Sequence, residues 1–572
     1  MSNNRLHRWV RLLSLSLSFI MSMGVLTACY TGNSVETASE SASDSVGDDA
    51  TSASETESVS GTESESKSES ESESEEETDA VALLPAATNF TVSNVFSDNM
   101  VVQRDEYVRV WGWADESQNG KRVSGTFLGT SAHTLVENGE WVLTFTKTWE
   151  ANTDMGNTMT VYGDGVAYEF HDVLVGDVYM GIGQSNMQYT VDWHLQYTPA
   201  SKHGTRDENA LIRLHFNSQD QTDGYPQRGS TDVCREIVSD SRWQLPTEEN
   251  YRRFSALGYY FAEKMLAANG NTVPIGFIEV EAAGKHLACF LPNDIADATG
   301  ADAYNEGKGI YESTGTETAA TRFVYNHYIA PFKKYAIKGL IWYQGESDLH
   351  KANTQAYADR FVPLMERMRS THNVLNKDFP IYIMELAPCV DANWAWGSVR
   401  AIQGYVANQC LTNAYLVPSC DLMAKIPTRD SIHPDIKWEQ SKRLAAVAAA
   451  VEYGRSSPDA TLGPVPVSIE FSDDRTSAVI TYANVGDGLT TTRLLTTVNG
   501  FVNCTDSFAV KHNLSAEITA PNQVTVTSPV GEINILGYNT QVVNQFAKQV
   551  TLCNSYGVPA GAMIFMSDET EG

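Results

Sequence analysis

The sequence predicts an α/β protein whose central domain is a parallel sheet covered by helices, with an all-β module on each side. Two observations predict this fold class. From about residue 171 to residue 455, apolar strand candidates alternate with helical stretches, which is the pattern of a parallel sheet buried on both faces. On both sides of that range, short strands separated by turn residues are typical of sandwich or jelly-roll-like modules.

The first residues have the pattern of an export signal. Three arginines precede an apolar run over residues 12–26, which is short for a membrane span. The run ends in Leu-Thr-Ala-Cys, and this stretch resembles the processing site of bacterial lipoproteins, in which the cysteine is lipidated. We therefore expect a lipoprotein signal at 1–29 and an extracellular protein anchored to the cell membrane through Cys29. The alternative is an ordinary signal peptide with an incidental cysteine.

Residues 30–86 are expected to form a disordered acidic linker rich in serine and glutamate. Between residues 31 and 79 the chain carries 16 acidic residues and one lysine, about half of its formal net charge of −31. Such a segment cannot bury enough apolar surface to offset its ordering entropy. The acidic balance therefore carries little information about the substrate, and the absence of a basic patch argues against nucleic acid as a partner.

The cysteines argue against both a disulfide framework and a structural zinc site. Eight cysteines are present, scattered and without a C-x-x-C pair, and seven remain once Cys29 is set aside. Cys504 and Cys553 are candidates for one disulfide in the C-terminal region. No metal or cofactor is expected.

The folded part is too long for one core, so several domains are expected. We predict an N-terminal β-sandwich at 87–170, a central α/β domain at 171–455 and a C-terminal β module at 456–572. Helical periodicity is clearest over residues 353–374. The predicted strands of the central domain are Val178–Ile182, Ile275–Val280, Leu340–Tyr343, Ile381–Met384 and Tyr415–Val417.

A candidate nucleophile follows the first of these strands, in the string Gly-Gln-Ser-Asn at 183–186. A serine on a tight turn between a strand and a helix presents its hydroxyl and its backbone N–H together, which suits a nucleophile and an oxyanion donor. Gly284 and Gln344 also come just after predicted strands. Ligands of parallel α/β sheets bind beyond the carboxyl ends of the strands, so we expect these residues to converge with Ser185.

A serine hydroxyl needs a base, and the base needs an orienting group. His433 is the candidate base and Asp430 its partner, on a loop that leads into a helix expected to begin at Pro434. The N–H of Ser185, the N–H of Gly284 and the side-chain amide of Gln344 are the candidate oxyanion donors. Taken separately, each motif has a plain alternative as a turn or a helix-capping segment.

Together, three motifs resemble one known family. Gly-Gln-Ser-Asn-Met at 183–187, Trp-Tyr-Gln-Gly-Glu-Ser at 342–347 and Asp-Ser-Ile-His-Pro at 430–434 are similar to those of the sialate O-acetylesterase group of SGNH hydrolases. The resemblance runs from about residue 93 to residue 455. It implies a flavodoxin-like three-layer α/β/α domain, often preceded by a β-sandwich, and metal-free hydrolysis of sugar O-acetyl esters.

The resemblance also implies roles for single residues. Ser185 would be the nucleophile, His433 the base and Asp430 its partner. Gln344 would replace the oxyanion asparagine of other SGNH enzymes, and Asn186 and Glu346 would support the site. Relatives carry a Trp-Gly-Gly-Thr-like string where this chain reads Glu-Ala-Ala-Gly-Lys at 281–285.

Because the family string is absent here, the resemblance supports an oxyanion role for Gly284 less directly than it supports the triad. The substrate pocket would also differ, since Lys285 and His286 would enter it. Arg400, Trp394 and Trp396 have two interpretations. They would contact a substrate carboxylate or stack on a sugar, or they would be structural residues of the core.

We therefore expect a surface-anchored serine carbohydrate O-acetylesterase. Its partner would be an acetylated carbohydrate, either a sialic acid or a hemicellulose glycan such as xylan or mannan. The alternatives are a non-catalytic carbohydrate-binding lipoprotein and a lipase-like esterase on the same fold. The sequence does not decide the oligomeric state.

Overall fold

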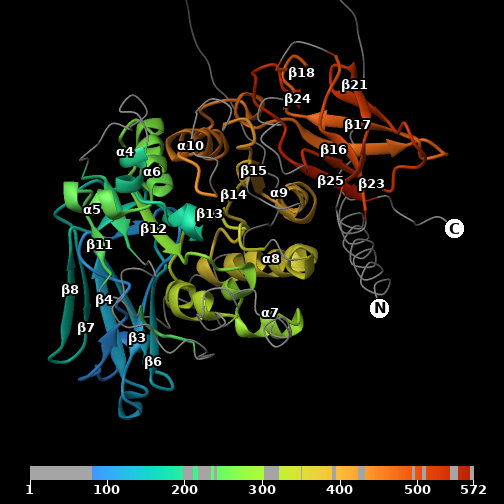
Figure 1. Ribbon diagram of the computed structural model, residues 1–572. Coiled ribbons are helices and arrows are strands. Elements are labelled where there is room, and N and C mark those ends of the chain that lie inside the picture. Colours follow the sequence, from blue (N-terminus) through green and yellow to red (C-terminus); the bar gives the residue numbers. More distant parts are fainter. Residues whose placement is uncertain are drawn as a thin grey trace, which may run out of the picture. The chain divides into compact units, whose positions relative to one another are not determined.

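The protein is described by a computed structural model (Figure 1). All described residues belong to one unit of the chain, Glu75–Ser567. The signal segment with Cys29, most of the acidic linker, Asp430 and Trp394 lie outside the described residues. The described ranges are 80–197, 210–216, 233–237, 241–301, 321–348, 351–389, 395–422, 432–492, 496–505, 510–540 and 552–566.

The central domain is built on one sheet, and its described strands run in the order β11-β10-β12-β9-β13-β14-β15. All neighbours from β10 to β15 pair in parallel, whereas β11 is antiparallel to β10. This arrangement confirms the predicted parallel sheet. The strands are β9 (Leu174–Gly183), β10 (Ile212–His215), β11 (Trp243–Gln244), β12 (Ile275–Glu281), β13 (Gly339–Tyr343), β14 (Ile381–Met384) and β15 (Ala414–Val417).

Helices cover both faces of this sheet, as consecutive residues of β13 demonstrate. The Trp342 ring packs against Phe361 of α8 (Lys351–His372), at 5.0 Å between ring centroids. The next side chain, Tyr343, accepts a hydrogen bond of 3.0 Å from Gln440 of α10 (Lys437–Tyr453). Neighbouring residues of a strand point to opposite faces. Figure 1 accordingly shows α8 on one side of the strands and α10, with α6 (Ala256–Ala268), on the other.

The N-terminal β module lends one strand to the central sheet. β2 (Val101–Gln103) pairs in parallel with the first residues of β9. The rest of the module forms two antiparallel sheets, β1-β3-β6 and β5-β4-β7-β8. The strands of these two sheets are β1 (Thr91–Val92), β3 (Val108–Trp113), β4 (Arg122–Phe127), β5 (Thr130–Leu135), β6 (Glu140–Phe145), β7 (Thr158–Tyr162) and β8 (Ala167–His171).

The C-terminal β module has two four-stranded sheets that share one apolar core, which includes Ile480, Tyr482, Phe501 and Val524. Cys504 on β19 and Cys553 on β24 are not joined, so the predicted disulfide between them is wrong; Cys504 Sγ instead lies 4.0 Å from the Thr540 hydroxyl. The strands are β16 (Val465–Phe471), β17 (Ser477–Ala483), β18 (Thr490–Thr491), β19 (Phe501–Cys504), β20 (Val510–Asn513), β21 (Ser515–Ala520), β22 (Gln523–Thr527), β23 (Ile535–Tyr538), β24 (Leu552–Cys553) and β25 (Met563–Met566).

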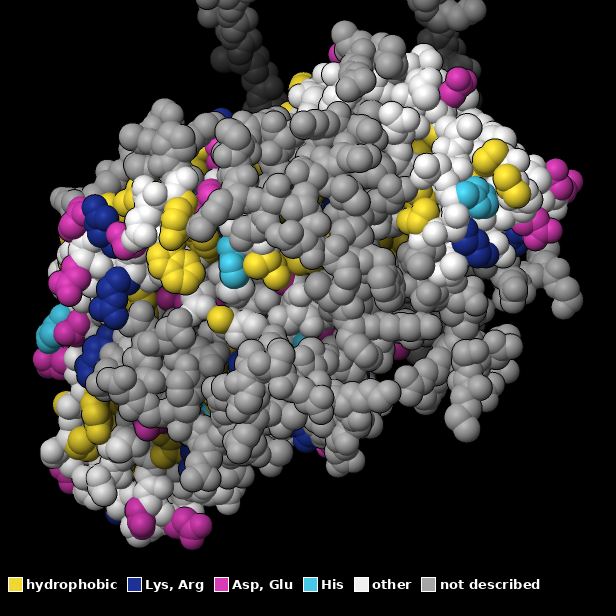
Figure 2. Space-filling view, viewed as in Figure 1, with side chains coloured by type: hydrophobic (Ala, Val, Ile, Leu, Met, Phe, Trp, Pro, Cys, Tyr) yellow, Lys and Arg dark blue, Asp and Glu magenta, His cyan; other side chains and the backbone are white. Residues whose placement is uncertain are grey.

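The remaining described helices are short, and no described helix is both long enough and apolar enough to cross a membrane. On the face shown in Figure 2, acidic and basic side chains are interspersed over the described N-terminal β module. The helices not yet introduced are α3 (Ser185–Gln188), α4 (Val191–Tyr197), α5 (Glu248–Arg253), α7 (Asn293–Ala298), α9 (Ala395–Tyr405) and α11 (Pro458–Thr461).

A buried carboxylate joins the C-terminal module to the central sheet. Glu385 follows β14 and is fully buried. One oxygen accepts from Arg400 of α9 at 3.0 Å and from the Ala562 N–H of the C-terminal module at 2.8 Å. The other oxygen accepts from the N–H groups of Ser419 and Cys420, just after β15. Glu385 therefore satisfies donors from three parts of the chain.

Replacement of Glu385 by alanine is expected to lower the free energy of unfolding by about 3–5 kcal/mol, because Arg400 would stay buried without its counter-charge. Urea denaturation of the full chain measures this change. Asp378→Ala is the matched control, since it removes an exposed carboxylate that pairs with Arg369 at 3.1 Å, and its cost should stay below about 1 kcal/mol. Equal losses in the two variants would contradict the assignment.

Candidate active site

Ser185 lies at the turn between β9 and α3. The turn is tight because Gly183 touches the neighbouring strand: a Cβ at this position would lie 2.2 Å from the Tyr343 carbonyl oxygen. Ser185 is the first residue of α3, and the first N–H groups of a helix have no partner within the helix. Among the described residues, none accepts a hydrogen bond from the Ser185 N–H. The hydroxyl and a backbone donor are therefore presented together.

Three strand ends meet at this edge of the sheet. β9 pairs with β12 on one side and with β13 on the other, and its last residue, Gly183, is in register with both Glu281 and Tyr343. The segments that carry Ser185, Gly284 and Gln344 therefore leave the sheet side by side. Gly284 has φ +66°, a left-handed conformation that glycine adopts without strain.

His433 reaches Ser185 from a distant part of the chain. Its Nε2 atom lies 2.7 Å from the Ser185 Oγ atom, and both residues are half-buried. Burial lowers the pKa of His433, and the positive charge of Lys437 lowers it further. A neutral imidazole is the form that accepts a proton. The predicted partner of His433, Asp430, lies outside the described residues, so its role stays a prediction.

The helix after His433 begins later than the sequence predicts. α10 begins at Lys437, with Ile436 as its N-cap, so Pro434 is not its first residue. The intervening Asp435 is buried and accepts a hydrogen bond of 2.5 Å from the Tyr189 hydroxyl. This carboxylate therefore holds the loop to the segment after the nucleophile instead of standing in the first turn of the helix.

Asn186, the residue after the candidate nucleophile, is bonded to Glu346. The Asn186 amide donates to Glu346 Oε1 at 2.5 Å and to the Ile432 carbonyl at 2.9 Å, while its oxygen accepts from Lys437 at 2.8 Å. All three polar side chains are buried. Burial raises the pKa of Glu346 to about 7 and lowers the pKa of Lys437 to about 7.

Gln344 is fully buried, and its amide group is occupied by protein acceptors. It donates to Asp348 at 2.5 Å and to the Lys285 carbonyl at 3.2 Å, and its side-chain oxygen accepts from the Tyr357 hydroxyl at 3.1 Å. Asp348 also accepts from the Leu287 N–H at 2.9 Å, and burial raises the pKa of this carboxyl to about 6. In this geometry Gln344 ties the loops after β12 and β13 together, and its oxyanion role stays a prediction.

Three further residues that the sequence offered as candidates for substrate contact, Arg400, Trp396 and His286, are buried in the protein. Arg400 is 1 % exposed and binds the protein's own Glu385. Trp396 is 2 % exposed and donates to the Ala387 carbonyl at 2.9 Å. His286 is buried, and burial lowers its pKa to about 4. The geometry of Arg400 and Trp396 therefore favours the core alternative over substrate contact.

Three site residues were missed by sequence reasoning: Lys437, Asp348 and Tyr189. Each lies within four positions of a quoted motif, so spacing alone carried a weak signal. A lysine four residues after a histidine is ordinary on a helix surface, and only burial distinguishes Lys437. The hydroxyl–carboxylate pair of Tyr189 and Asp435 joins positions 246 apart, which no local pattern indicates.

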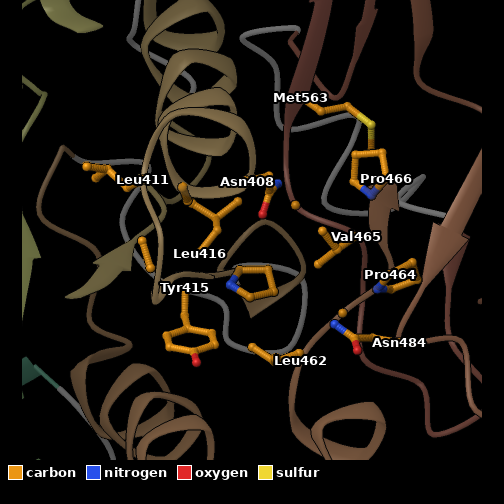
Figure 3. A pocket seen from close by; sticks show the side chains of 15 residues that line it. Asn408, Leu411, Tyr415, Leu416, Leu462, Pro464, Val465, Pro466, Asn484 and Met563 are labelled. Carbon is orange, nitrogen blue, oxygen red and sulfur yellow. The ribbon is translucent and has the colours of Figure 1, made fainter. Parts of the chain in front are cut away.

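A cavity of about 280 Å³ lies elsewhere, at the junction of β15 and β16. Figure 3 shows Tyr415 and Leu416 on one side of it and Pro464, Val465 and Pro466 on the other. None of its lining residues belongs to the Ser185–His433 site, so this cavity is separate from the candidate active site.

Comparison with known proteins gives a family for this site. The profile of a family described as carbohydrate esterase, sialic acid-specific acetylesterase, matches residues 175–447. That range contains Ser185, Gln344 and His433. It begins within β9 and ends within α10, so it corresponds to the central sheet and its helices.

Relatives extend the similarity over more of the chain. Sialate O-acetylesterases from Pongo abelii and Homo sapiens are each 26% identical over 425 residues, covering 69% of this chain and 77% of theirs. The solved structure of a carbohydrate acetylesterase from Xanthomonas citri matches 84% of this chain and all of its own, with a TM-score of 0.65 and 24% identity, and so shares the fold. Residues 175–447 of the chain therefore match the sialic acid-specific acetylesterase family of carbohydrate esterases.

Proposed function

We propose that the protein hydrolyses O-acetyl esters of carbohydrates by acyl transfer to Ser185. The observation that carries this proposal is the 2.7 Å contact between His433 Nε2 and Ser185 Oγ at the carboxyl edge of the sheet. The match to a carbohydrate esterase family supports a carboxylic ester hydrolase. The geometry supplies the nucleophile and the base for that reaction.

The reaction takes place in two halves. His433 takes the proton of the Ser185 hydroxyl while Oγ attacks the acetyl carbonyl carbon, which forms a tetrahedral intermediate. The intermediate collapses to acetyl-Ser185, and the imidazolium returns the proton to the departing sugar oxygen. Water, deprotonated by His433, then attacks acetyl-Ser185, and acetate leaves as the proton returns to Oγ.

The developing oxyanion needs donors aimed at it, and one such donor is typically worth about 2.7–4 kcal/mol of barrier. The Ser185 N–H at the start of α3 is the first candidate. Gly284 is the second, because its loop leaves the strand next to β9. Gln344 connects the loop of Gly284 to the loop after β13, through its bonds to Lys285 and Asp348. We propose that it acts by holding them in place.

We propose O-acetylated sialic acid as the substrate, since the matching family and the curated relatives are described by that sugar. Lys285, next to Gly284, adds a positive charge on the same loop that suits a carboxylate. We also propose the extracellular, membrane-anchored location through Cys29, which rests on the signal pattern alone.

Ser185→Ala is expected to abolish acetyl ester hydrolysis, with a loss in kcat/KM of about three orders of magnitude or more, because the variant lacks the hydroxyl that lies against His433. Acetate release from a small acetyl ester measures it, with circular dichroism to establish that the variant is folded. Ser370→Ala, which alters an exposed serine of α8, is the control and should keep full activity. A folded Ser185→Ala enzyme of wild-type activity would refute the proposal.

The pH profile should report His433. The neutral imidazole is active, so activity rises as pH rises through the pKa of His433 and is lost below it. Burial and Lys437 lower that pKa, so the acid limb of kcat/KM should have its midpoint below about pH 6.5, the ordinary value for histidine. Initial rates on a non-ionising acetyl ester between pH 4 and pH 9 measure the limb. A midpoint clearly above 6.5 would contradict the assigned environment.

The substrate proposal predicts faster acetate release from O-acetylated sialoglycans than from acetylxylan or acetylmannan. Equal amounts of ester groups and one enzyme concentration make the three rates comparable. Lys285→Gln should raise KM for the sialoglycan several-fold and leave KM for acetylmannan unchanged, since the sialic acid carries a carboxylate and the mannan is built of neutral sugars. Acetate release from acetylxylan or acetylmannan but not from the sialoglycan would show that the substrate is a hemicellulose and not a sialic acid.

A further inference from the structure

His433 lies on a loop that is held by its backbone on both sides. The carbonyl of Ile432, one residue before it, accepts from the Asn186 amide at 2.9 Å. The carbonyl of Pro434, one residue after it, accepts from the Lys437 ammonium at 2.9 Å. Lys437 also donates to the Asn186 side-chain oxygen at 2.8 Å, so the two donors are bonded to each other.

We propose that Lys437 is a positioning residue that keeps the His433 ring against Ser185, acting with Asn186 and Glu346 as one buried clamp. The inference rests on the proposed function, because it concerns the same nucleophile and base. It adds a residue that no motif or comparison assigns. It also gives Asn186 a defined role, since the residue next to the nucleophile carries the amide that grips the loop of the base.

The three side chains of the clamp are buried, so their mutual hydrogen bonds are not chance contacts of mobile surface groups. Lys437 is fully buried, Asn186 is 1 % exposed and Glu346 is 3 % exposed. Lysine is seldom fully buried unless it is paired, and here its head group is surrounded by acceptors and aromatic rings. Tyr189 and Tyr343 lie with their ring centroids 4.7 Å and 5.6 Å from Nζ.

The clamp also sets the electrostatics around the imidazole. Burial lowers the pKa of His433, and the positive charge of Lys437 lowers it further. Burial lowers the pKa of Lys437, and the carboxylates of Glu346, after β13, and Asp435, before α10, partly oppose that shift. Loss of the ammonium therefore removes a positive charge beside His433 and should raise its pKa. An imidazole with a raised pKa loses its active neutral form at a higher pH.

The test is Lys437→Met in the full chain, which keeps an unbranched side chain one atom shorter and removes its charge and donors. A freed loop lets the ring drift, and a misplacement of about 1 Å can cost about 100-fold in rate. We expect kcat for a small acetyl ester to fall about 10- to 100-fold with KM within about twofold of wild type. The acid limb of kcat/KM should move to higher pH.

A second variant covers the case in which Lys437→Met does not fold, because that change leaves Glu346 buried without its counter-charge. Lys437→Met/Glu346→Gln removes both charges, so it should fold, and its kcat should still be low and its acid limb still displaced. Lys442→Met alters an exposed lysine of the same helix and is the matched control, expected to leave kcat and the limb unchanged.

The rate at which a fluorophosphonate labels Ser185 separates this inference from the proposed function. In that reaction Ser185 Oγ bonds to phosphorus and fluoride leaves, so no acetylated sugar is involved. The clamp predicts slower labelling in both Lys437 variants than in wild type. A wild-type enzyme that neither hydrolyses acetyl esters nor is labelled would overturn the proposed function. Two results with an active wild-type enzyme would overturn the clamp alone. In the first, a folded Lys437 variant has the kcat and the acid limb of wild type. In the second, kcat of the folded variant is reduced but its acid limb does not move.

Discussion

The parallel register of β12, β9 and β13 is the constraint on which the rest of the site depends. Because Gly183 pairs with the last residues of both neighbours, three loops leave the sheet at one edge, and each contributes a polar group. Gly183 makes this possible, since any Cβ there would collide with the backbone of β13. A shift of register by one residue would reverse the side chains of a strand between the two faces and would separate the loops.

The cost of this arrangement is the burial of polar and charged groups. Moving one ion out of water costs several kcal/mol unless hydrogen bonds and a counter-charge offset it. Around Ser185 the chain buries Glu346, Asp348 and Lys437, and each has hydrogen-bonding partners within the described residues. An apolar core would be as stable or more so. The retained charges are therefore best explained by the fixed positions that their hydrogen bonds impose on the loops.

Much of the fold could be predicted from periodicity, because a buried parallel strand is an uninterrupted apolar run. The predicted Ile381–Met384 coincides with β14. β9 extends four residues before the predicted strand, through Gly176 and Asp177. Asp177 is fully buried because Arg104 and Tyr453, 73 and 276 positions away, bond to its carboxylate. Local patterns do not contain partners at such separations, and the predicted strand therefore stopped short.

The same limit explains which parts of the site could be predicted. Ser185 and His433 belong to motifs whose chemistry can be predicted from single residues, and the structure places the two side chains 2.7 Å apart. Lys437 looks like a surface residue in sequence and is distinguished only by what surrounds it. Asn186 shows why this matters: one amide next to the nucleophile bonds to the loop of the base. This bond couples the nucleophile turn to the loop of His433, and by that coupling it opposes changes in the distance between the two reacting groups.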